Sequence, residues 1–246
     1  MHSDDTTIGR FLTRREMLAL LGASGAAFAI GAAPGERRRG LSSRPLPACV
    51  VRPAQTEGPY FVDGRLSRSD IRSDPADGVP RPGTLLTLSF LVSRIGAGRC
   101  DPLPGALVDV WQCDAEGIYS GVVDPQFNTE GQKFLRGNQT TDREGRATFL
   151  TIYPGWYRGR AVHIHFKIRV PAGADRTAEF TSQVYFDDAL TDQVHTAAPY
   201  AAKGPGRTRN AEDRIFRTSG GDQLLLAPRA AAGGYDATFE VGLQLG

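Results

Sequence analysis

The chain has 246 residues, of which 40% are hydrophobic, so it is long enough to build a substantial core. Its 29 basic side chains nearly balance 27 acidic ones, and residues 1–40 hold six basic and four acidic groups, which leaves 23 of each in the remainder. This neutral remainder lacks the electrostatic footprint of a nucleic-acid binder and gives no reason to expect stable association with an anionic membrane surface.

Residues 1–33 are predicted to be a targeting segment. Arg14 and Arg15 precede a run of small and apolar residues, 17–33, which is too short and too rich in Gly and Ala to predict a membrane span. This pattern resembles a twin-arginine export signal, and the alternative is an ordinary secretory leader with two adjacent arginines. Cleavage is expected after Ala29, Ala32 or Ala33. We therefore expect an exported protein, periplasmic or extracellular, with a linker over residues 34–48 and one domain over residues 49–246.

The chain has three cysteines, Cys49, Cys100 and Cys113, and export would place them in an oxidising compartment where one disulfide is plausible. Cys100 and Cys113 flank a predicted strand, which would hold them beyond the reach of a disulfide. Cys49 is therefore the favoured partner for either, and three separate thiols remain the alternative.

From Thr84 onward, short alternating or apolar runs are separated by turn residues, and no long amphipathic helix is indicated. One short helix is predicted at Asp188–Ala198. The pattern predicts an all-β fold, a single-domain antiparallel sandwich with long loops. The expected strands are 85–92, 106–113, 147–152, 162–170, 179–186, 223–227 and 237–245.

A polar arm precedes the first strand and contains Gly58, Pro59, Tyr60 and Phe61. A Gly-Pro step followed by aromatic residues predicts an ordered segment that packs on the sandwich. We consider two roles for it: a cap on the core, or the lining of a pocket mouth, with Gly58, Pro59 and Tyr60 as candidate substrate-binding residues.

His163 and His165 alternate with apolar residues in one predicted strand, so their imidazoles share a face. Zinc or ferrous iron would require a further His, Cys or carboxylate ligand, but no acidic residue adjoins this pair. Tyrosines are nearby instead: Tyr153 and Tyr157 upstream, and Tyr119 in an earlier turn. Hard phenolate oxygens favour a highly charged ion, so this set indicates ferric iron.

Several motifs in order resemble the intradiol ring-cleavage dioxygenases, and in particular their exported, short-armed members. Gln112 and Val162 depart from the common pattern at positions that are not metal ligands in that family. The resemblance extends from about Thr56 to Phe186 and is carried by residues 108–120 (VDVWQCDAEGIYS), 134–137 (FLRG), 141–145 (TDREG), 153–157 (YPGWY) and 160–166 (RAVHIHF).

The resemblance implies an Fe(3+) cofactor held by Tyr119, Tyr157, His163 and His165. Tyr157 would be the tyrosine that leaves the metal when a catechol binds. It further implies that Arg160 stabilises negative charge on the ring and that Gln183 lies near the site. The partners would be a small catecholic substrate and O2, with a muconate-type diacid as product.

Taken singly, these residues also have ordinary structural interpretations. Tyr119 is also explained as a buried anchor, Arg160 as the partner of an acid, Trp111 as a core residue and His195 as a surface residue. Tyr153 competes with Tyr157 for the second phenolate. The alternative function is a non-catalytic, transthyretin-like or carbohydrate-associated binding module with a structural metal site. The identity of the catechol and the oligomeric state stay open.

Overall fold

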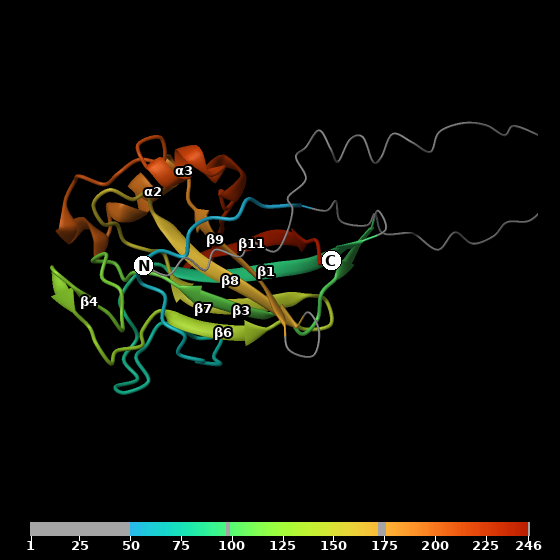
Figure 1. The fold of residues 1–246 in the computed structure, drawn as a ribbon. Helices are drawn as coiled ribbons and strands as arrows, with labels where there is room; N and C mark the ends of the chain where they lie inside the picture. The colour runs from blue at the N-terminus through green and yellow to red at the C-terminus, as the bar shows by residue number, and fades with distance from the viewer. Residues whose placement is uncertain (1–49, 97–98, 172–175, 246) are drawn as a thin grey trace, which may run out of the picture.

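A computed structural model describes residues 50–96, 99–171 and 176–245. Within these ranges the chain forms two β-sheets packed face to face, with four short helices at one end (Figure 1). The strands are β1 (Leu85–Gly96), β2 (Arg99–Pro102), β3 (Leu107–Trp111), β4 (Val123–Asp124), β5 (Phe127–Asn128), β6 (Arg136–Thr140), β7 (Arg146–Ile152), β8 (His163–Pro171), β9 (Thr177–Tyr185), β10 (Arg229–Ala231) and β11 (Gly234–Leu243). The helices are α2 (Asp188–His195), η1 (Tyr200–Lys203), α3 (Arg214–Thr218) and η2 (Gly221–Leu224).

The first sheet is built around β1, which pairs with β11 in parallel and with β2 and β7 antiparallel. The second sheet has the order β6-β3-β8-β9, and all its neighbours are antiparallel. β4 and β5 form a separate small hairpin. The all-β sandwich predicted from the sequence is confirmed, with one parallel pair among its antiparallel strands.

The core lies between the sheets and is made by the inward-facing residues of alternating strands. Phe90 of β1 contacts Phe166 of β8, with ring centroids 5.0 Å apart, and both contact Phe239 of β11. All three rings are at most 1% exposed, and burying each contributes roughly 2 kcal/mol. On β8 this places the neighbours of Phe166 on the opposite face, so His163 and His165 lie on the outer face of the second sheet.

The predicted strand 223–227 is wrong. Residues 221–224 form the 3-10 helix η2, and Leu225 then makes a single bridge to Tyr185. Gly220 precedes this helix with a φ of 69°, a left-handed conformation that glycine adopts without steric cost and that turns the chain away from an extended path. Strand β6 was not predicted, because its sequence RGNQT shows no apolar alternation.

Helix α2 confirms the helix predicted at Asp188–Ala198, although it ends three residues earlier, at His195. Asp187 caps it by accepting hydrogen bonds from the main-chain N–H groups of Ala189 and Leu190. Pro199 follows, and the residue before a proline disfavours helical conformation.

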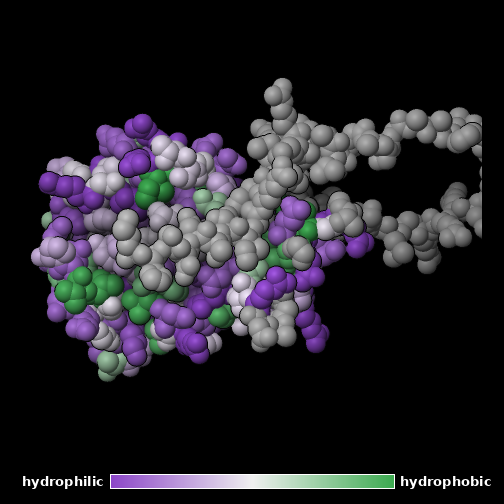
Figure 2. Space-filling view, in the orientation of Figure 1, coloured by the Kyte–Doolittle hydropathy of each residue, from purple (hydrophilic) through white to green (hydrophobic). Residues whose placement is uncertain are grey.

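Cys100 is disulfide-bonded and Cys113 is a buried free thiol, so the two are not bonded to each other, as their spacing predicted. Cys49, the favoured partner, lies outside the described residues, as do the predicted targeting segment 1–33 and linker 34–48. No helix in the described ranges is long and apolar enough to cross a membrane. Hydrophilic residues dominate the face seen in Figure 2, with hydrophobic ones in small separate patches.

Candidate metal centre

Four side-chain donor atoms converge at one end of the second sheet. Nε2 of His163 lies 3.0 Å from Nε2 of His165, 3.2 Å from the Tyr157 hydroxyl and 3.4 Å from the Tyr119 hydroxyl. His163 and His165 open strand β8, and the two tyrosines lie on separate loops. The structure thus brings together all four residues that the sequence proposed as metal ligands.

The two tyrosine loops are held against each other by main-chain contacts. Gly155 donates its N–H to the carbonyl of Asp114 at 3.0 Å, and a Cβ atom at position 155 would lie 2.3 Å from the carbonyl oxygen of Ala115. Only glycine permits this approach. Asp114 also accepts hydrogen bonds from the N–H groups of Glu116 and Ile118, which shapes the turn before Tyr119. The Pro-Gly-X-Tyr spacing therefore has a steric basis.

The tautomer of His163 is determined by its surroundings. Its Nδ1 lies 2.7 Å from the carbonyl oxygen of Ala161, so Nδ1 carries the proton and Nε2 presents a lone pair to the other three donors. The ring of His165 stacks on Trp111 at 5.0 Å with an interplanar angle of 8°. Both imidazoles are therefore fixed in orientation.

Burial keeps all four groups uncharged in the absence of a cation. It lowers the pKa of His163 to about 3, and the charge of Arg160 acts in the same direction; it also lowers the pKa of His165 well below the usual range. Burial raises the pKa of both tyrosines above the usual range, although Arg160 opposes that rise. Deprotonated phenols in this site therefore require a compensating positive ion.

The donor set fits a metal ion. Two adjacent ligands that each lie about 2.1 Å from one ion would be separated by roughly 3.0–3.4 Å at bond angles between octahedral and tetrahedral, and the three distances from His163 Nε2 fall in this range. No group of three or more His, Cys, Asp or Glu residues suited to a metal occurs in the described part of the chain. In that part of the chain, the phenol oxygens of Tyr119 and Tyr157 are the donors that lie beside the two imidazoles.

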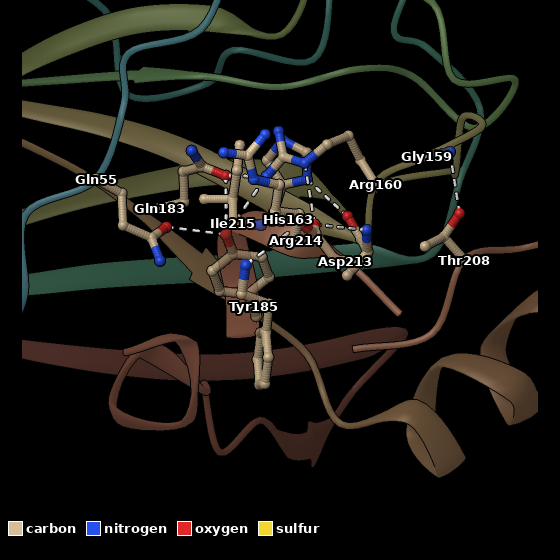
Figure 3. A network of polar contacts seen from close by, with 12 residues as sticks. Gln55, Gly159, Arg160, His163, Gln183, Tyr185, Thr208, Asp213, Arg214 and Ile215 are labelled. Carbon is tan, nitrogen blue, oxygen red and sulfur yellow. Dashed lines mark hydrogen bonds and ion pairs between the residues drawn. The ribbon is translucent and has the colours of Figure 1, made fainter. Parts of the chain in front are cut away.

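Arg160 lies beside the donors and is held from two sides (Figure 3). Its Nη1 is 3.4 Å from His163 Nε2, its Nη2 donates to the amide oxygen of Gln183, and its Nε donates to Asp213 at 2.9 Å. Gln183 in turn donates to the carbonyl of Thr56 at 2.9 Å. The guanidinium group is therefore fixed at the edge of the site, where it can stabilise negative charge.

Comparison with known proteins identifies the family. A family model described as Dioxygenase matches residues 56–209, more than half of the chain. The computed structure is similar to the intradiol ring-cleavage dioxygenase from Tetranychus urticae, with a TM-score of 0.70 and 28% identity over 80% of this chain and 95% of that one. This chain belongs to the intradiol ring-cleavage dioxygenase family.

Curated relatives within this family match over shorter lengths. Chlorocatechol 1,2-dioxygenase of Pseudomonas sp. (strain P51) is 31% identical over 157 residues, 55% of this chain and 55% of the relative. The protocatechuate 3,4-dioxygenase beta chain of Burkholderia cepacia is 36% identical over 113 residues, 42% of this chain and 47% of the relative. The chain thus spans about half the length of these curated members.

The N-terminal arm of this family member packs over the proposed ligands. Tyr60 stacks on Tyr119 with ring centroids 4.6 Å apart and donates its hydroxyl to Asp124 at 2.7 Å. Gly58 lies against His165, because a Cβ atom at position 58 would be 3.2 Å from His165 Cε1. Pro59 lies between them and is exposed. The arm therefore covers the donor cluster as well as the core.

Two sequence interpretations are corrected by the structure. His195 is not a free surface residue: it is half-buried, its Nε2 lies 3.0 Å from the Pro154 carbonyl and its ring stacks on Tyr200. Tyr153 does not supply the second phenol oxygen of the donor cluster, because its hydroxyl is hydrogen-bonded to Thr191 at 2.8 Å within the main core. Trp111 is buried as expected, and it also stacks on the proposed ligand His165.

Asp213 is a residue of this site that sequence reasoning missed. One carboxylate oxygen accepts from Arg160 and from the N–H of Ala161, and the other caps helix α3 through Ile215 and Phe216. Burial alone would raise its pKa, but Arg160 and the hydrogen bonds from the main-chain N–H groups of Ala161 and Phe216 together outweigh that effect, and the net shift is below 3.8. Asp213 lies 53 positions from Arg160, and its only signal in the sequence is that of a helix cap.

Replacing Asp213 by asparagine should remove the charge but keep the cap, because Asn and Asp cap helices about equally well. We expect the Asp213→Asn variant to lose roughly 2–3 kcal/mol of unfolding free energy at pH 7, since Arg160 would lose its buried counter-ion. A carboxylate with a depressed pKa stabilises the fold above its unfolded pKa, near 3.8, and this contribution disappears as pH falls through the folded value.

Urea unfolding of both proteins at pH 7 and near pH 3 tests this expectation. The difference in unfolding free energy between wild type and variant should narrow in acid. An equal difference at both pH values would contradict a role for the charge of Asp213.

Proposed function

We propose that Tyr119, Tyr157, His163 and His165 hold ferric iron and that the protein uses O2 to cleave a catechol between its two hydroxylated carbons. Both atoms of O2 would enter the product, a muconate-type diacid, so the reaction requires no external reductant. The observation that carries this proposal is the convergence of two phenol oxygens and two imidazole nitrogens on one point. Bound ferric iron would supply a Lewis acid that activates the catechol for reaction with O2.

Tyr157 is better placed than Tyr119 to release the metal. Tyr119 is fully buried and its carbonyl accepts a hydrogen bond from Thr129 at 2.6 Å, whereas Tyr157 is half-buried and adjoins the exposed residues Arg158 and Gly159. Because burial raises the pKa of Tyr157, its released phenolate oxygen would be a strong base. We propose that this Tyr157 oxygen accepts the proton of one substrate hydroxyl.

Arg160 would stabilise the negative charge that develops on the ring. Burial would lower the pKa of its guanidinium, but the neighbouring Tyr157, Asp213 and Tyr185 together outweigh this effect and the net shift is upward. The group therefore stays charged, and Asp213 and Gln183 hold it in place before substrate arrives. Such preorganised donors contribute without rearrangement at the moment of reaction.

We assign Gly58, Pro59 and Tyr60 to the wall of the substrate site, because they cover His165 and Tyr119. Gly58 has a φ of 76°, so alanine there would cost about 1–2 kcal/mol of folding stability and would also press on His165. We expect the Gly58→Ala variant to retain less iron per chain and to show a raised KM for catechol.

A matched control for Gly58→Ala is available in the same region of the chain. Gly78 has a φ of 68° and no heavy atom within 4 Å of the added Cβ, so Gly78→Ala carries the backbone cost alone. Iron content and KM should change in the first variant and stay near wild type in the second. Equal iron content and equal KM in the Gly58→Ala and Gly78→Ala variants would exclude a steric role for Gly58 at the site.

The test of the proposed function is direct. The purified full chain should contain about one iron per chain, show a visible phenolate-to-iron absorption and consume O2 with catechol, hydroxyquinol or protocatechuate. Product analysis should find cleavage between the hydroxylated carbons. A colourless protein with zinc or no metal, and no O2 uptake on any of these catechols, would refute the proposal.

We also propose export to the periplasm or the cell exterior, on the basis of the twin-arginine pattern at Arg14 and Arg15. Replacing both arginines by lysine should retain the protein in the cytoplasm if the twin-arginine route is used. Cell fractionation measures this, and unchanged export would indicate an ordinary secretory leader.

A further inference from the structure

A pocket lies beside the candidate metal centre, between the arm and strands β3 and β6. It has a volume of about 130 Å³, and Phe61, Trp111, Lys133, Arg136 and Asn138 are among its lining residues. None of the four proposed metal ligands lines it. It is therefore a site distinct from the one assigned to the catechol ring.

One row of side chains across the second sheet connects this pocket with the metal centre. Arg136, Trp111, His165 and Gln183 are successive Cα partners on β6, β3, β8 and β9, so their side chains share a face. Two strand spacings of about 4.8 Å place Arg136 roughly 10 Å from His165 along the row. Trp111 stacks on His165 and stands between them.

Within the described part of the chain, two buried donors on residues that line this pocket have no acceptor. Arg136 and Trp111 are 5% and 2% exposed, and among the described residues neither Arg136 Nη1 nor Trp111 Nε1 has a hydrogen-bond partner. The other two guanidinium nitrogens of Arg136 donate to Ser120. A buried donor without an acceptor costs about 1–3 kcal/mol, and more when it is charged. A ligand with two acceptor oxygens would satisfy both.

The charge of the pocket favours an anion. Arg65 and Lys133 lie at its rim, in addition to Arg136 within it. Asp109 also lines the pocket, but its carboxylate accepts two hydrogen bonds from Arg169, at 2.8 and 3.0 Å, and is thereby neutralised. The positive charges of the lining are thus left without a partner carboxylate inside the pocket.

The pocket has room for a small carboxylate, because about 10–15 Å³ of such volume holds one water molecule and the pocket offers about 130 Å³. The two oxygens of a carboxylate match two separate N–H donors, one of them charged.

We propose that this pocket binds a small carboxylate through Arg136 Nη1 and Trp111 Nε1. The carboxylate site requires no iron, so this proposal can be correct or wrong independently of the proposed ring-cleavage reaction. The carboxylate has two sources: a free small acid, or the carboxyl group of an acidic substrate or product.

Equilibrium dialysis of the full-length protein against labelled sodium acetate, at constant ionic strength in sodium chloride, measures how many acetate molecules bind to each chain. We expect one acetate per chain with the visible absorption unchanged, and at least tenfold weaker binding by Arg136→Gln and Trp111→Phe. Trp111→Phe leaves the contacts of Arg136 with Ser120 intact, so it decides the test if Arg136→Gln fails to fold. The control is Arg52→Gln, because Arg52 also donates to main-chain carbonyls but lies elsewhere.

The outcomes separate the proposal from its rivals. Displacement of acetate by protocatechuate but not by catechol would identify the substrate carboxyl as occupant; displacement by neither would identify a free acid. Acetate binding that persists in both pocket variants, that changes the visible absorption, or that is absent from the wild type would overturn the proposal.

Discussion

Phenylalanine at position 119 or 157 is expected to remove most of the visible phenolate-to-iron absorption and to lower activity by a factor on the order of 100 or more. Each substitution deletes one of the two phenol oxygens that lie beside His163 Nε2, and His163 and His165 cannot replace it. The Tyr119→Phe variant should retain less iron than Tyr157→Phe, because Tyr119 is the fully buried anchor of the pair. Elemental analysis, visible spectra and O2 uptake measure these effects.

Tyr153→Phe is the matched control for both variants. Tyr153 is also a buried phenol, but it is hydrogen-bonded to Thr191 in the core and lies outside the donor cluster. It should lose about 1 kcal/mol of stability and keep its colour and activity. If Tyr119→Phe and Tyr157→Phe both kept iron and activity, the ferric site would have to be abandoned in favour of a different metal and ligand set.

Arg160→Lys is expected to lower kcat by about 10²-fold while changing KM little. Lysine keeps the positive charge but has one nitrogen, so it cannot donate at once to Asp213 and Gln183, which hold the guanidinium of Arg160 from two sides. Losing one preorganised group that stabilises transition-state charge typically costs 10²–10³ in kcat. Steady-state O2 uptake with catechol separates the two constants.

The control for this variant is Arg207→Lys. Arg207 is likewise a largely buried arginine, paired with Asp188 and Asp192, but it does not contact the donor cluster. Its replacement should affect stability and leave kcat near wild type. A similar fall of kcat in both variants would mean that Arg160 acts through folding, and a fall in neither would remove it from the reaction.

The strands of the sandwich core were predictable because apolar alternation is a local property. β1, β8 and β11 carry inward residues such as Phe90, Phe166 and Phe239 at every second position, and this period is visible in the sequence. Strand β6 was missed because its sequence RGNQT has no apolar alternation, and its residues Arg136 and Asn138 line the pocket. The strand predicted at 223–227 failed because Gly220 turns the chain into a helical turn.

The sequence by itself predicted the proposed metal ligands, because His-X-His places two imidazoles on one face of a strand and the family resemblance implied Tyr119 and Tyr157 beside them. Only the tertiary structure decided which groups act on those ligands. Asp213 reaches Arg160 across 53 positions, and Arg136 stands beside Trp111 because β6 pairs with β3. Such contacts arise when strands and loops distant in sequence pack together, and a buried charge gains its partner only then. No local pattern records that pairing.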